Sequence, residues 1–216
     1  MNRKSIVIPS DILLIIKLDQ LKPFINRWMK RANELLEKRE SLNDFFDEFF
    51  TLYVIYNRLY NIVAVHSISV GLVKKKDQQS NHSILDGKAA TIYIAKFLKE
   101  DQHKIITVLA NEIKHLKLII SEERFHIALN NGMPDLKEDR VYKEKLSSNK
   151  PSVVFLSVLE VLYEIRCNVF HGEKSFEDRQ TEILKTSNII LRTVIGYLVP
   201  RIEEMGAQHL GNNSSS

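Results

Sequence analysis

The sequence contains few of the residues that support disulfide-bonded, strand-rich or membrane-spanning proteins. Cys167 is the only cysteine among 216 residues, so an internal disulfide and a cysteine-based zinc site are both excluded. Seven glycines and five prolines provide few tight turns, which favours long helices over many short strands. No apolar run is long enough to span a membrane, and the N-terminal segment, interrupted by Pro9, lacks the pattern of a signal peptide. These features predict a cytoplasmic protein with no membrane partner.

The overall composition is that of a globular protein. Hydrophobic residues make up 44% of the chain and charged residues 27%, which is unlike a disordered sequence. The formal net charge is +4 and the isoelectric point is near 9.0. This balance is compatible with a polyanionic partner but does not require one.

Apolar residues recur at helical spacing through the first third of the chain. Ser10 is expected to cap a first helix, and Pro23 suits the first turn of the next one. Ser41 and Asp44 have the spacing of a capping box before an aromatic-rich helix. One face of that helix carries Phe45, Phe49, Leu52, Tyr56, Leu59 and Val63.

Helical spacing continues beyond a polar loop at 74–80. It returns at 90–98 and 105–120, whereas 130–135 and 147–151 have the composition of loops. Two strong helices follow, one over 152–170 and one from Ser175 to just before Pro200. Ser175 and Asp178 form a possible capping box at the start of the second helix. We therefore predict a single all-helical domain over residues 1–205 and a disordered tail over 206–216.

The most informative segment is the end of the helix predicted over 152–170. Arg166 has no acidic residue three or four positions away that would form an intrahelical ion pair, its neighbours being Leu162, Tyr163, Val169 and Phe170. His171 is followed by Gly172, a residue favoured just past a helix end. A fixed cation and a titratable imidazole thus lie close together in sequence at a helix terminus.

This segment resembles the R-x4-6-H motif of the HEPN superfamily. The match is Arg166-Cys167-Asn168-Val169-Phe170-His171, and the aromatic run at 49–60 is similar to the helix that many HEPN proteins place before the motif. The resemblance covers roughly residues 24–200. It implies an all-α, HEPN-like up-and-down helical bundle, with additional N-terminal and middle helices in this chain.

The resemblance also implies an activity, namely metal-independent cleavage of single-stranded RNA with Arg166 and His171 as catalytic residues. Histidine can exchange a proton with a 2′-hydroxyl or with the leaving oxygen, and arginine can hold two phosphate oxygens. Attack by the 2′-hydroxyl leaves a 2′,3′-cyclic phosphate and excludes DNA as substrate. The family further implies a homodimer with a composite active site, no cofactor, a toxin or phage-defence setting, and an antitoxin or other regulatory partner.

The chain departs from the family pattern at two positions. Many members have a polar residue directly after the arginine, where this sequence has Cys167, so Asn168 is the candidate for the supporting role. Toxins silenced by adenylylation have tyrosine two residues after the histidine, where this chain has Glu173, so that regulation is not expected. Tyr163, one turn before Arg166, is a second candidate for a supporting residue.

Other candidate sites have competing interpretations. Lys74, Lys75 and Lys76 could contact RNA phosphates, although such a run is more often a solvated loop. The tyrosines of the aromatic helix could stack on bases, but their helical spacing favours a place in the core. Two E-x-x-H segments, 112–115 and 123–126, have the spacing used in di-iron bundles, yet they lie too close in sequence to occupy separate helices easily. No metal site is predicted.

Two further classes of function remain as alternatives. A non-catalytic HEPN-type module that binds a nucleotide, RNA or a protein would have the same fold and dimer but no turnover. A helical scaffold unrelated to HEPN would place Arg166 and His171 away from any symmetric interface.

Overall fold

The computed structural model describes residues 10–80, 83–122, 126–130, 133–170 and 180–213. The fold is an all-α helical bundle, as predicted, with two short strand pairs in its connections. The longer helices are α1 (Ser10–Asp19), α2 (Leu21–Glu37), α3 (Leu42–Ser69), α6 (Gln102–Val108), α7 (Ala110–Ser121), α8 (Leu136–Leu146), α9 (Pro151–Phe170) and α10 (Gln180–Asn213).

Shorter elements connect α3 to α6 and α7 to α8. They are the 3-10 turn η1 (Lys75–Asp77), strands β1 (Gln78–Ser80) and β2 (Ser83–Ile84), α4 (Asp86–Lys88), the π-helix η2 (Ala89–Tyr93), α5 (Ile94–Phe97), and strands β3 (Leu129–Asn130) and β4 (Met133–Pro134). β1 pairs antiparallel with β2, and β3 with β4. The loop predicted over 74–80 therefore contains one turn of 3-10 helix and a short strand.

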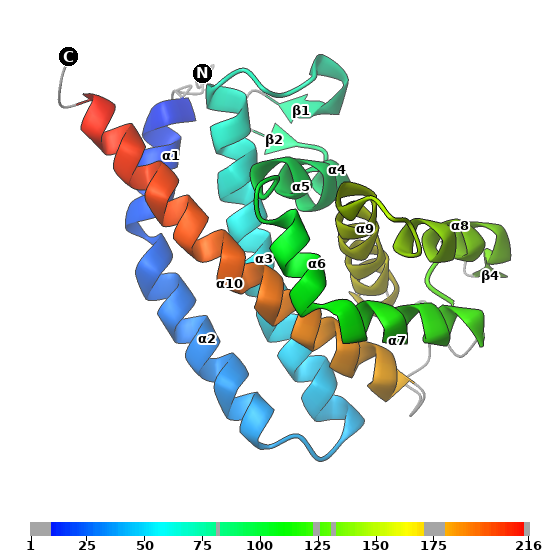
Figure 1. The fold of residues 1–216 in the computed structure, drawn as a ribbon. Coiled ribbons are helices and arrows are strands. Elements are labelled where there is room, and N and C mark those ends of the chain that lie inside the picture. The colour runs from blue at the N-terminus through cyan, green and yellow to red at the C-terminus, as the bar shows by residue number, and fades with distance from the viewer. Residues whose placement is uncertain (1–9, 81–82, 123–125, 131–132, 171–179, 214–216) are drawn as a thin grey trace, which may run out of the picture.

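α3 is the central helix of one half of the molecule. It packs against α1, α2 and α10, and Figure 1 shows α5 to α9 grouped on the other side. The predicted capping box is confirmed, because the Ser41 side chain accepts from the Asp44 N–H and the Asp44 carboxylate accepts from the Ser41 N–H at 2.8 Å. The predicted aromatic face is buried except at Phe45, which is half-buried, and Tyr53 and Tyr56 belong to the core.

A buried carboxylate joins α3 to the C-terminal helix. Glu48 is fully buried and accepts from Arg39 Nε at 2.6 Å and from Arg192 Nε at 2.7 Å. The Asn188 amide also donates to Glu48, at 3.0 Å. Since a buried charge is costly without partners, this network offsets the burial and holds the α2–α3 hairpin against α10.

The last helix is longer than the sequence predicted. α10 continues through Pro200, where we predicted its end, and through Gly206, where we predicted the tail to begin. A proline inside a helix costs about 3 kcal/mol. Ile202 and Met205, which lie beyond it, are both buried. Each buried side chain of this kind contributes roughly 1.5–3 kcal/mol, enough to offset the proline.

Candidate active site

The motif arginine lies near the end of α9. This helix begins at Pro151, a residue that suits the first helical position because its missing N–H has no intrahelical partner there. α9 packs against α5, α6, α8 and η2 through side chains spaced mainly by three and four residues. Those buried side chains are Val154, Phe155, Val158, Leu159, Val161, Leu162 and Ile165. Arg166 follows the last of them at the border of the apolar face.

Two tyrosine rings hold the Arg166 side chain in place. Its guanidinium carbon lies 5.8 Å from the centre of the Tyr53 ring, on α3, and 6.0 Å from the centre of the Tyr163 ring, on α9. The Nη1 atom also lies 3.9 Å from the Cys167 thiol. Arginine stacks favourably on aromatic faces, so these contacts restrict a side chain that would otherwise be flexible.

Asp86 is a member of this cluster that the sequence analysis did not identify. The Tyr60 hydroxyl donates to one of its carboxylate oxygens at 2.7 Å, and the Tyr163 hydroxyl donates to the other at 3.2 Å. A Cβ atom on the next residue, Gly87, would lie 3.2 Å from the Tyr163 ring, so the close approach of this turn to α9 favours glycine. The Asp86-Gly87 pair was the available signal, but nothing in the sequence placed it beside Arg166.

The cluster combines one fixed positive charge, on Arg166, with a neutral thiol, neutral phenols and the Asp86 carboxylate. Burial alone would lower the pKa of Arg166, but the hydrogen bond to Cys167 and the nearby Tyr53 and Asp86 raise it, so the guanidinium stays charged. Burial raises the pKa of the Cys167 thiol, which is therefore neutral at pH 7. Burial also raises the pKa of Tyr163, and the Asp86 carboxylate adds to that shift.

A pocket of about 340 Å³ opens beside Tyr163. Gly87 and Lys88 line it from the α4 side, and Tyr142 and Glu160 from α8 and α9. Tyr163 thus both lines this pocket and contacts the Arg166 guanidinium.

The other two motif positions differ in how far the structure describes them. Asn168 is 2% exposed, and its amide donates to the Ile127 carbonyl at 2.7 Å. It anchors the segment before β3, and any support it gives Arg166 acts through the position of α9. His171 lies outside the described residues, as do Ser175 and Asp178, so the pairing of His171 with Arg166 stays a prediction.

The three lysines are exposed and lie far from Arg166. Tyr53, which contacts Arg166, lies 16 residues before the last residue of α3, a rise of about 24 Å. Lys74 to Lys76 follow that end of the helix, and Figure 1 shows this turn at the opposite end of the molecule from the start of α10. The fold does not bring the lysines and the motif arginine together.

The histidines of the two E-x-x-H segments bind different protein groups. His115 Nδ1 lies 2.9 Å from the Thr186 hydroxyl, and His126 Nδ1 lies 3.1 Å from the Asp139 carboxylate. Glu123 lies outside the described residues. Within the described parts of the chain, no group of three or more His, Cys, Asp or Glu side chains is arranged to hold a metal ion.

Comparison with known proteins adds no further assignment. No protein-family model, curated protein or solved structure matches this chain. Among the helices that the structure describes, none combines the length and apolar character needed to cross a membrane.

Proposed function

We propose that this protein is a metal-independent endoribonuclease of the HEPN type that cleaves single-stranded RNA as a homodimer. The observation that carries the proposal is the Arg166 cluster, in which a charged guanidinium near the end of α9 contacts two tyrosine rings. That guanidinium precedes His171 by five residues in an all-helical chain. Together these features support the resemblance to the R-x4-6-H motif.

The proposed chemistry divides between the two motif residues. Arg166 donates to two phosphate oxygens and stabilises the charge that develops on them in the transition state. His171 takes a proton from the 2′-hydroxyl, which attacks the adjacent phosphorus as the bond to the 5′-oxygen breaks. The second protomer's copy of His171, in its protonated form, gives a proton to the departing 5′-oxygen. The products are a 2′,3′-cyclic phosphate and a free 5′-hydroxyl. DNA lacks the attacking group and is not cleaved.

Asp86 acts in this proposal as a positioning residue. It accepts the hydroxyl protons of Tyr60 and Tyr163, and so fixes the Tyr163 ring against Arg166. The Tyr163 hydroxyl already donates its proton to Asp86 in a hydrogen bond, so we assign no proton transfer to this tyrosine. That leaves the acid–base step to His171.

The assembly and setting that we propose follow from the same resemblance. Two protomers would bring two copies of Arg166 and His171 into one cleft sized for a ribose-phosphate backbone. The activity would serve as a cytoplasmic toxin or in defence against phage, restrained by an antitoxin or another regulatory partner.

The experiment is a cleavage assay with an end-labelled single-stranded RNA in EDTA. Wild-type protein is expected to cleave, whereas Arg166→Ala and His171→Ala are expected to lose cleavage. Matched controls are Arg31→Ala and His103→Ala, which change an exposed arginine and an exposed histidine outside the cluster. Loss of cleavage in EDTA, or full cleavage by His171→Ala, would contradict the mechanism. Tight RNA binding without any cleavage would instead indicate the non-catalytic module.

A further inference from the structure

A second cluster of polar groups surrounds Asp139 on α8. This residue is 5% exposed, and its Oδ1 atom accepts from the backbone N–H groups of Ile127 at 3.0 Å and Ala128 at 2.9 Å. Its Oδ2 atom lies 3.1 Å from His126 Nδ1. Both carboxylate oxygens are therefore engaged by the segment that precedes β3, and the His126 ring is oriented with its Nδ1 edge toward Asp139.

His126 faces a pocket of about 240 Å³ that α7 and α8 also line. Arg140 and Lys143 are three residues apart, which places them on one face of α8, and both line this pocket. Ser121, at the end of α7, lines it too, but its hydroxyl donates to the Lys117 carbonyl at 2.6 Å. That bond uses the hydroxyl proton, so the arrangement does not form a Ser–His–Asp nucleophile.

The charge balance of the pocket favours an anion. Arg140 and Lys143 are exposed, and neither forms an ion pair with a carboxylate in the part of the chain that the structure describes. Among the described residues that line the pocket, Asp139 is the one acidic residue, and its oxygens already accept from His126 and two backbone amides. In the described part of the lining, two cations and an imidazole thus face the hollow, and the Asp139 carboxylate is satisfied by the protein.

We propose that this pocket is a phosphate subsite for the backbone of the RNA substrate, an inference that rests on the proposed function. The segment beside the pocket is bonded to the motif helix, because the Asn168 amide donates to the Ile127 carbonyl. Arg166 and Asn168 are two residues apart, so they point about 160° apart, toward nearly opposite sides of α9. A strand that contacts both Arg166 and the pocket therefore has to pass around α9.

The test measures RNA binding in a His171→Ala background, so that cleavage does not interfere. Arg140→Ala/Lys143→Ala is expected to bind a single-stranded RNA roughly tenfold more weakly at 50 mM salt, as for the loss of one charge-assisted contact. The slope of log affinity against log salt should flatten by about 0.7, the value for one phosphate on a single strand. Inorganic phosphate should weaken RNA binding by the His171→Ala parent, whose pocket is unaltered. It should not weaken RNA binding in the same way once Arg140 and Lys143 are replaced.

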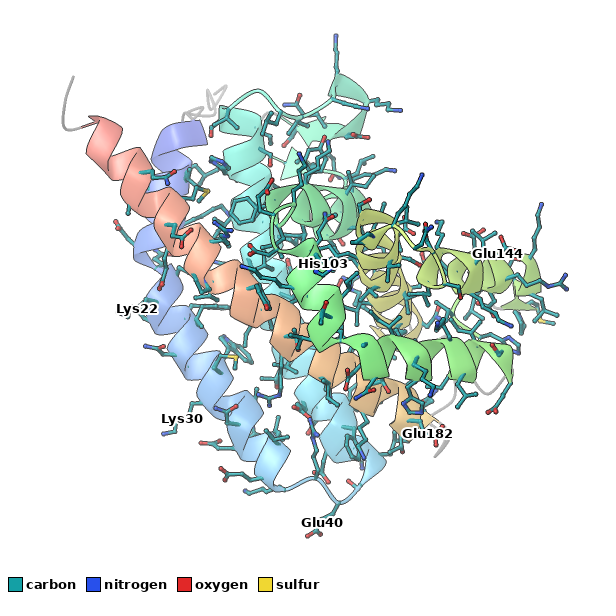
Figure 2. The ribbon with its side chains drawn as sticks, in the orientation of Figure 1. Lys22, Lys30, Glu40, His103, Glu144 and Glu182 are labelled. Atoms are coloured by element: carbon teal, nitrogen blue, oxygen red, sulfur yellow. The ribbon has the colours of Figure 1, made fainter. Side chains whose placement is uncertain are left out.

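The matched control is Lys22→Ala/Lys30→Ala, which removes the same charge from α2. Figure 2 shows both lysines on the outer side of that helix, away from α8. The control is expected to change RNA affinity by less than about twofold. The subsite would be overturned if Arg140→Ala/Lys143→Ala and its His171→Ala parent had the same RNA affinity and the same slope of log affinity against log salt. Since binding is read without cleavage, a protein that binds RNA here but never cleaves it would refute the proposed activity and leave the subsite standing.

Discussion

Replacing Arg166 with alanine is expected to separate activity from stability. The folded state loses two cation–π contacts at 5.8 and 6.0 Å and one weak contact to a thiol. Contacts of this kind are worth about 0.5–1 kcal/mol each at sites open to solvent, so the free energy of unfolding should fall by about 1–2 kcal/mol. Removing a group that stabilises transition-state charge typically lowers kcat by about 10²–10³. The activity loss should therefore far exceed the stability loss.

The matched control for this prediction is Arg58→Ala. The Arg58 guanidinium lies 5.9 Å from the centre of the Phe24 ring, so its removal costs a comparable aromatic contact outside the site. Urea unfolding and RNA cleavage are measured on both variants, together with Arg166→Lys, which keeps the charge but cannot bind a phosphate with two parallel donors. Cleavage by Arg166→Ala at the wild-type rate, or an equal loss of cleavage in both alanine variants, would refute the proposed role of Arg166.

Three further predictions concern the groups around the cluster and in the core. Asp86→Asn removes the charged acceptor of the Tyr60 and Tyr163 hydroxyls, so the free energy of unfolding in urea should fall by about 1.5–3 kcal/mol. An unchanged urea midpoint would show that these hydrogen bonds contribute nothing to stability. Glu48→Gln leaves two arginines facing a neutral amide, so the free energy of unfolding, measured by thermal unfolding, should fall by about 3–5 kcal/mol. An unchanged free energy of unfolding would contradict the stabilising role of this buried network. Burial raises the pKa of the α3 tyrosines, so the unfolded chain gives up their protons first as the pH rises. Stability should therefore be insensitive to these groups below about pH 10 and fall above it, which alkaline unfolding followed by tyrosine absorbance would check.

Most of the helical framework could be predicted because its signals are local. The Ser41–Asp44 capping box and the aromatic spacing of α3 specify a helix start and a buried face without any tertiary information. The end of α10 could not be predicted in the same way. Proline usually ends a helix, and only the burial of Ile202 and Met205 against other elements outweighs that tendency here. No prediction was made for α8, whose exposed face is rich in charge and whose start depends on the Asp135 cap.

The site could be predicted only as far as the motif extends in sequence. Arg166 and Tyr163 are one turn apart on α9, so their contact follows from helix geometry. Asp86 and Tyr53 come from distant segments, and their approach depends on how η2 and α3 pack against α9. The same limit applies to the Asp139 cluster, in which His126 pairs with a carboxylate 13 residues away across a turn.

The most direct test of the central claim is the chemistry of the cleaved ends. Wild-type protein is incubated with a single-stranded RNA in EDTA, and the products are identified by mass spectrometry. The expected products are a fragment with a 2′,3′-cyclic phosphate and a fragment with a 5′-hydroxyl. No cleavage is expected where a single 2′-deoxynucleotide replaces the attacking ribose. Fragments carrying a 5′-phosphate, cleavage at the 2′-deoxy position, or cleavage that requires a metal ion would contradict the proposed mechanism.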